Sequence, residues 1–178
     1  MKTHIMILAA ALGGSVALAG AAEPAPAPAD SRVSVTFVDP GHFTDFKQDD
    51  NDATSQFLVD QLREFIATTG GRYVPAGMNL EIKVTDVDLA GSFEPWRGPE
   101  FARIRVVKSI YPPRIKLQFK LTDARGQTVS SGDRSLTDLA FQMRDPFLQP
   151  SDDYLRYEKD LLRDWFRTEF KPLTVAGN

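Results

Sequence analysis

Two segments alternate strictly between apolar and polar residues, and this alternation restricts the fold more than any other feature. Leu80, Ile82 and Val84 alternate with charged residues, and apolar residues occupy every second position from Ile115 to Leu121. Successive side chains of a strand point to opposite faces, so each segment predicts a strand with one buried face. Strands of this kind are typical of a largely antiparallel sheet with one face open to solvent.

The remaining elements follow from similar patterns. Further strands are predicted at 33–37, at 103–106 and at 127–134. Apolar residues three and four apart predict a helix that begins near Asp52, Thr54 or Ser55 and ends at Gly70-Gly71, and a second from about 152 to 170 that Pro172 closes. We therefore predict an α+β two-layer sandwich: a mostly antiparallel sheet of about four strands, with two helices on one face, in the order β-α-β-β-β-α.

The first thirty residues predict export. A lysine precedes an apolar run that ends in small residues, which is typical of a secretory signal peptide over residues 1–22. An Ala/Pro-rich tether is expected at 23–31, one folded domain at 32–172 and a disordered tail at 173–178. The mature protein is expected to be soluble, without a transmembrane segment, and periplasmic or secreted, with signal cleavage between about Ala19 and Ala22.

Composition narrows the chemistry further. The chain has no cysteine, which excludes thiol nucleophiles, disulfide exchange and cysteine metal sites. Its net charge is −3, and this value argues against general nucleic-acid binding, which favours basic domains. No motif indicates a cofactor, so none is predicted.

The alternation in "NLEIKVTDVDLAGSFEPW" changes partway through. Leu80, Ile82 and Val84 share one parity, whereas Val87 and Leu89 have the other. A straight strand would bury Asp86 and Asp88, which costs several kcal/mol unless each carboxylate has a partner. We therefore predict a bulge or strand end near Thr85 or Asp86, and a metal site at Asp86 and Asp88 is the alternative.

Three stretches in order carry a resemblance: "VTFVDPGHFTDF", "LEIKVTDVDLAGSFEPW" and "YPPRIKLQFKLTDARGQTVSSGDRSLTDLAF". They resemble the segments of a family of exported Gram-negative bacterial proteins known as domain of unknown function 3016. The resemblance covers nearly all of 32–170. It implies export and a single domain, and it brings no activity, ligand or catalytic residue.

An enzyme is one functional hypothesis. His42 is the only histidine after the predicted signal peptide, and Asp39 and Asp45 are near it in sequence. A metal-dependent or His/Asp-based hydrolase could use the 39–52 loop together with Asp86 and Asp88. However, "DDNDATSQFLVD" lacks the spacing of a calcium-binding loop, and no serine lies in a nucleophile elbow.

The preferred hypothesis is a non-enzymatic binding domain of the cell envelope. Basic residues lie opposite the apolar positions of the predicted strands, and the loop "GSFEPWRGPEF" adds exposed aromatic candidates. Together they predict a partner-binding surface for an envelope protein or an anionic envelope polymer. The predicted surface contains Phe93, Trp96, Arg97, Phe101, Arg103, Arg105, Arg114, Lys116 and Lys120, with Lys83 adjacent.

Overall fold

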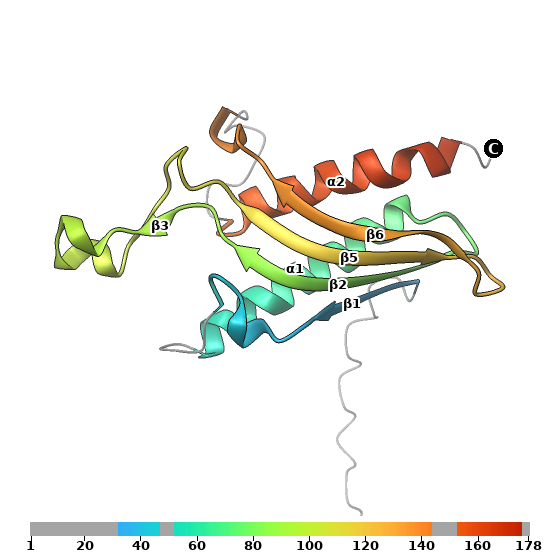
Figure 1. Ribbon diagram of the computed structural model, residues 1–178, viewed down its shortest axis with the longest axis horizontal. Coiled ribbons are helices and arrows are strands. Elements are labelled where there is room, and N and C mark those ends of the chain that lie inside the picture. Colours follow the sequence, from blue (N-terminus) through green and yellow to red (C-terminus); the bar gives the residue numbers. More distant parts are fainter. Residues whose placement is uncertain (1–31, 47–51, 144–152, 176–178) are drawn as a thin grey trace, which may run out of the picture.

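The protein is a two-layer α+β sandwich in which two helices cover one face of a four-stranded sheet (Figure 1). The computed structural model describes residues 32–46, 52–143 and 153–175. The sheet has the order β1-β2-β5-β6, and the helices are α1 (Asp52–Tyr73) and α2 (Arg156–Val175). The strands are β1 (Val33–Phe37), β2 (Asn79–Asp88), β5 (Arg114–Thr122) and β6 (Thr128–Thr137). The predicted architecture is confirmed.

The strand pairing explains why the sheet is mostly antiparallel. β2 pairs with β5, and β5 pairs with β6, both in antiparallel orientation. β6 follows β5 directly in the sequence, whereas an insertion over residues 89–113 separates β2 from β5. β1 pairs with β2 in parallel, and α1 makes the crossover that a parallel connection needs. The chain therefore follows the predicted β-α-β-β-β-α order through β1, α1, β2, β5, β6 and α2.

The helix-facing side of the sheet forms the core. Phe119 of β5 contacts Trp165 of α2 edge to face, with ring centroids 5.9 Å apart, and Tyr73 of α1 stacks on Phe166 at 5.9 Å. These contacts join both helices and the sheet in one apolar cluster. Its fully buried strand residues are Leu80, Ile82, Val84, Ile115, Leu117 and Leu121 of the alternating segments, together with Val87 of β2.

A β-bulge in β2 confirms the predicted change of parity. Val84 pairs with Leu117 and Asp86 pairs with Lys116, so Thr85 is the extra residue. The bulge turns Val87 into the core and leaves Asp86 and Asp88 on the open face. The two carboxylates are thereby kept out of the apolar layer.

The predicted strand at 103–106 is wrong as a member of the main sheet. Only β4 (Arg105–Val106) is extended there, and it pairs with β3 (Ser92–Phe93) in a separate two-stranded sheet. The position beside β2 belongs to β5, which buries four side chains where 103–106 could bury two at most. Three 3₁₀ helices accompany the strands: η1 (Pro40–His42), η2 (Pro95–Arg97) and η3 (Pro99–Ala102). A fourth, η4 (Phe141–Met143), follows β6.

Both helices run further than predicted. α2 begins at Arg156 and continues through Pro172 to Val175, so the prediction that Pro172 closes it is wrong. α1 continues through Gly70 and Gly71 to Tyr73. Gly70 serves packing instead: an added Cβ would lie 3.2 Å from both Val33 of β1 and Phe166 of α2. The predicted signal peptide, tether and cleavage site, Asp49, Asp50, Asn51 and the last residues 176–178 lie outside the described residues.

We predict that Gly70→Val destabilises the fold by about 1–3 kcal/mol, because a branched side chain must force α1 away from β1 and α2. Equilibrium urea unfolding measures the change. Thr68→Val introduces the same side chain at an exposed site of the same helix and is expected to change stability by about 0.5 kcal/mol or less. Equal losses in the two variants would contradict the packing role of Gly70.

Candidate functional site

The two aspartates of the predicted acidic pair on β2 each form an ion pair with a basic side chain of the neighbouring strand β5. Asp86 accepts a hydrogen bond from the Thr44 backbone N–H at 2.9 Å and pairs with Lys116 at 2.9 Å. Asp88 pairs with Arg114 at 3.2 Å. Partial burial opposes the charged form of Asp86, but the hydrogen bonds from Lys116 and Thr44 lower its pKa. Partial burial and the nearby Asp45 charge raise the pKa of Asp88.

These contacts give the two aspartates structural roles in the sheet and in the loop after β1. Each carboxylate closes a cross-strand ion pair, and Asp86 also caps the turn at Thr44. Within 32–46, 52–143 and 153–175, no group of three His, Asp or Glu side chains is arranged to hold a metal ion. The geometry at Asp86 and Asp88 thus follows the bulge hypothesis.

His42 and its neighbouring acids do not converge. The His42 Nδ1 atom lies 2.8 Å from Asp39, but the His42 side chain is 86% exposed, on the protein surface. Asp45 points elsewhere and pairs with Arg105 at 2.7 Å. The predicted catalytic set of Asp39, His42 and Asp45 is therefore split between an exposed pair and a half-buried ion pair.

The most distinctive feature of the structure is an arm that projects from the end of the main sheet (Figure 1). It contains β3, η2, η3 and β4, residues 92–106, and we call residues 95–104 its tip. The chain enters it through Leu89, Ala90 and Gly91, which follow β2 and which we call the root. Gly91 has a φ of +88°, and an added Cβ would lie 2.9 Å from the Val106 carbonyl oxygen. Only glycine therefore fits where the segment that enters the arm passes the segment that leaves it.

Arg105 fastens the arm to the root. Its Nη1 atom donates to the Gly91 carbonyl at 2.7 Å and to the Leu89 carbonyl at 3.3 Å, while Nη2 donates to Asp45. Asp45 in turn accepts a hydrogen bond from the Leu89 N–H at 2.5 Å. The Arg105 side chain is 10% exposed, so the prediction that Arg105 lies on an open binding face is wrong. The planar, multidentate arginine head satisfies three acceptors that a strand pattern cannot anticipate.

Glu158 of α2 also binds the backbone of the root. Its Oε1 atom accepts a hydrogen bond from the Ala90 N–H at 2.7 Å. Burial raises the pKa of Glu158 to about 7, although the Ala90 N–H and the Arg105 charge favour its ionised form. Its Oε2 atom is buried without a hydrogen-bond partner, as is the Arg105 Nε atom. The root therefore holds a carboxyl group that titrates near neutrality, with Arg105 and Asp45 as the charged groups that affect it.

We predict that Glu158→Gln stabilises the protein relative to the wild type as pH rises. The folded-state pKa of about 7 exceeds the ordinary value of 4.5, so between these values the folded state binds the extra proton and wild-type stability falls with rising pH. Glutamine removes this titration while keeping an acceptor for Ala90. The difference in unfolding free energy between variant and wild type should grow by on the order of 3 kcal/mol between about pH 4 and pH 8.

Urea unfolding over this pH range measures the effect. Glu64→Gln alters an exposed glutamate and is the matched control, for which the difference from the wild type should stay constant with pH. A constant difference for Glu158→Gln as well would show that the Glu158 carboxyl is not buried as the structure places it.

A second polar cluster holds the arm together internally. The Glu94 side chain is 2% exposed and accepts hydrogen bonds from Lys108 at 2.6 Å, Arg97 at 2.9 Å and Tyr111 at 3.2 Å. The bond from Lys108 is the main cause that lowers the pKa of Glu94. Arg97 also lies over the Phe101 ring, 4.4 Å from its centroid. A single carboxylate thus ties together η2, the residues after β4 and the chain entering β5.

We predict that Glu94→Gln loosens the arm, because an amide cannot balance the charges of Lys108 and Arg97. Limited digestion with trypsin should cut after Arg97, Arg103 or Lys108 faster in this variant than in the wild type. Glu100→Gln, an exposed change within η3, should leave the cleavage rate unchanged. Equal cleavage rates in the wild type and Glu94→Gln would contradict the role of Glu94.

The arm turns its large apolar side chains outward. Trp96 is 70% exposed and Ile104 55%, and Phe93 is also exposed beside Arg105. Arg103 is also exposed, and its side chain forms no ion pair or hydrogen bond within the described chain. More than half of the exposed large apolar residues of the described ranges lie on the arm or in the two adjoining loops, where they are Val107, Ile110, Leu139 and Met143.

The predicted basic sheet face is not continuous. Lys83, Lys116 and Arg114 do lie on the open face, but each pairs with an acid, at Glu81, Asp86 and Asp88 respectively. Lys120 lies directly opposite Glu81 on the neighbouring strand. Of the predicted binding residues, the structure brings together Phe93, Trp96, Arg97, Phe101 and Arg103 on the arm, and Arg114 lies in the main sheet.

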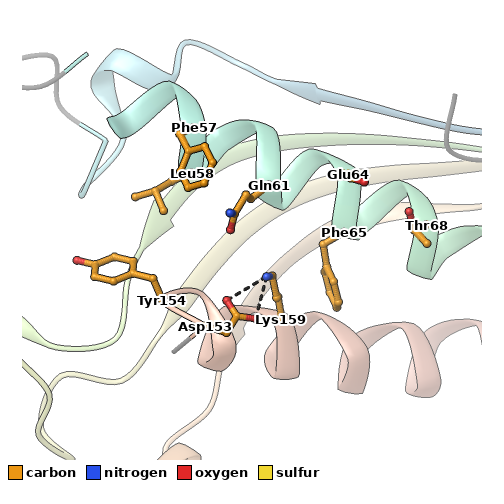
Figure 2. A pocket seen from close by; sticks show the side chains of 9 residues that line it. All are labelled: Phe57, Leu58, Gln61, Glu64, Phe65, Thr68, Asp153, Tyr154 and Lys159. Carbon is orange, nitrogen blue, oxygen red and sulfur yellow. Dashed lines mark hydrogen bonds and ion pairs between the residues drawn. The ribbon is translucent and has the colours of Figure 1, made fainter. Parts of the chain in front are cut away.

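A groove lies between the two helices (Figure 2). It has a volume of about 690 Å³, and Gln61 and Phe65 point into it from α1, while Asp153 and Lys159 form an ion pair of 2.8 Å on the α2 side. Phe57 and Tyr154 stand exposed at one end. The groove is open to solvent, and two of its three charged residues, Asp153 and Lys159, pair with each other, while the third is Glu64.

Glu94 and Glu158 were not predicted from the sequence. Glu158 was open to detection, since it lies three residues after Leu155 and four before Leu162, on the inward face of α2. Glu94 gave a weaker signal as a single acid between two aromatic residues. Its cationic partner Lys108 comes from beyond β4, and only the arm's own fold brings the two together.

Comparisons with known proteins identify a family and no characterised relative. No curated protein and no solved structure matches the chain. A family model described as "Protein of unknown function (DUF3016)" matches residues 31–168, nearly the whole of the sandwich and the arm. The resemblance carried by the three sequence stretches is confirmed, and the chain belongs to the DUF3016 family of proteins of unknown function.

Proposed function

We propose that this protein is an exported, non-enzymatic binding domain of the cell envelope that contacts its partner through the arm. The observation that carries the proposal is Trp96, which is 70% exposed on a tip that projects from the sandwich. Tryptophan and arginine dominate the binding energy of many interfaces, and the tip presents both. A large aromatic side chain in this position does nothing for the core.

The construction of the arm supports the proposal. Glu94 with its three donors fixes the interior of the arm, and Arg105 with its acceptors fixes the arm to the root. A surface that is ordered before binding loses less conformational entropy when the partner arrives. Such fixation of an otherwise exposed hairpin is favourable for recognition.

The proposed location rests on the beginning of the sequence. Residues 1–22 have the order of a cationic start, an apolar run and small residues that secretory signal peptides share. We propose that the mature protein acts in the periplasm or is secreted. Neither helix of the described chain combines the length and the apolar character that a bilayer-spanning segment needs.

The alternative hydrolase has less geometric support. A general base needs a reacting group within hydrogen-bond reach and a shielded site, whereas His42 lies exposed on η1, and Asp39 is the acid that pairs with it among the described residues. Asp45, Asp86 and Asp88 are held by Arg105, Lys116 and Arg114. These acids therefore stabilise the loop and sheet around the root.

We predict that the mature protein, produced without residues 1–22, captures a component of envelope extract and that Trp96→Ala reduces this capture by about tenfold or more, because it removes a central aromatic contact. Capture on immobilised protein, followed by quantitative mass spectrometry and lipid analysis, measures it. Trp96 is exposed, so the variant should retain the wild-type unfolding transition.

Phe57→Ala is the matched control, since Phe57 is an aromatic residue with 59% exposure that belongs to the interhelical groove. It should capture as much as the wild type. Loss of capture with Phe57→Ala and retention with Trp96→Ala would move the binding site from the arm to the groove and overturn the proposal as stated.

A further inference from the structure

We propose that the partner of the arm is an anionic phospholipid surface, with Trp96 entering the headgroup layer and arginines of the tip contacting lipid phosphates. This inference rests on the proposed function and specifies the partner. It is carried by three properties of the tip: its projecting shape, its outward apolar residues and its local positive charge.

The shape fits a soft surface better than a protein interface. A stable protein interface buries about 800 Å² on each partner, usually over a broad patch. The tip instead comprises two short 3₁₀ helices at the end of a narrow two-stranded stem (Figure 1). A bilayer deforms around a projecting group, so a narrow tip reaches its full contact there without a complementary pocket.

The exposed residue types match the membrane interface. Tryptophan accumulates at the level of lipid headgroups because its ring is apolar and its indole N–H finds polar partners there. Trp96 is the most exposed large apolar side chain of the arm, and Ile104 at the other end of the tip is 55% exposed. Pro95 and Pro99 add apolar surface and fix the start of each 3₁₀ helix.

The charge of the tip differs from that of the whole chain. The chain has a net charge of −3, whereas residues 92–108 contain four basic residues against two acids, Glu94 and Glu100. Arg97 and Lys108 pair with Glu94, so Arg103 is the tip cation that forms no ion pair within the described residues. Cations near an anionic leaflet contribute about 1 kcal/mol each, and an acidic body is repelled by the same leaflet. Contact through the tip is therefore the favoured orientation.

The root adds a reason why the tip can bear such contact. Arg105 joins the arm to the Leu89 and Gly91 carbonyls, and Asp45 joins Arg105 to the loop after β1. These contacts fix the arm to the end of β2 and to the loop after β1. The tip is presented at a fixed position relative to the sandwich.

Vesicle binding tests the inference directly. The mature protein is mixed with vesicles of phosphatidylethanolamine and phosphatidylglycerol, and with vesicles of phosphatidylcholine alone, and the bound fraction is measured by sedimentation. We expect binding to the anionic vesicles that falls as salt is added, and weaker binding to the neutral ones. Trp96→Ala should lower the partition coefficient by about tenfold or more, and Trp96→Phe by less.

Matched variants distinguish the contributions. Arg103→Gln should weaken binding to anionic vesicles without altering binding to neutral ones, while Phe57→Ala should bind as the wild type does. A brominated lipid should quench Trp96 emission in the bound state and leave the emission of the buried Trp165 unchanged. Equal binding of wild type and Trp96→Ala, or equal binding to both kinds of vesicle, overturns the inference.

The two proposals can fail separately. If no vesicle binds while envelope capture still depends on Trp96, the partner is a protein or polymer, so the lipid inference is wrong and the proposed function stands. If neither vesicle binding nor envelope capture depends on Trp96, both proposals are wrong.

Discussion

The backbone of Leu89, Ala90 and Gly91 is the point on which the rest of the structure depends. These residues follow β2. The Leu89 and Ala90 N–H groups and the Leu89 and Gly91 carbonyls are bound by three side chains from distant parts of the chain, Asp45, Arg105 and Glu158, and the Gly91 N–H donates to the Tyr111 carbonyl. Buried backbone groups at a strand end need partners, and here side chains supply most of them. The side chains that do so come from the loop after β1, the arm and α2, so the same contacts fix the position of all three.

The bulge at Thr85 makes this arrangement possible. Without it, the parity of β2 would bury Asp86 and Asp88 and turn Val87 outward. With it, Val87 and Leu89 continue the core to the end of the strand, and the aspartates meet Lys116 and Arg114 on the open face. The root is therefore fixed both by the packing of Leu89 in the apolar core and by the hydrogen bonds of Asp45, Arg105 and Glu158 to its backbone.

The sequence was informative where the physics is local. Alternating residues from Leu80 and from Ile115 specify one-sided strands, helical spacing specifies α1 and α2, and a change of parity locates the bulge, all within a few neighbouring residues. The pattern failed at Arg105, because its alternation with Ile104 and Val106 is equally compatible with a solvent face. Its partner Asp45 is distant in sequence, and only the completed fold brings the two together.

Gly70 and Gly71 show the same limit in a helix. Two glycines lower helix propensity locally, which suggested an end to α1. The structure continues the helix because Gly70 lies against Val33 and Phe166, where packing of the sandwich outweighs the local preference. The candidate site could likewise be predicted only in part. The sequence indicated that aromatic and arginine residues take part in it, but their assembly on the arm depends on tertiary contacts.

The arm reverses the usual distribution of residues in a folded element. A hairpin this narrow has too little interior for an apolar core, and its buried centre is occupied by the Glu94 carboxylate with Lys108, Arg97 and Tyr111. Charged groups taken out of water contribute little net stability, so this cluster fixes geometry more than it drives folding. With the interior committed to polar contacts, Trp96 and Ile104 have no place to pack within the arm. Their exposure is thus a consequence of how the arm is built, and a surface outside the protein is what can bury them.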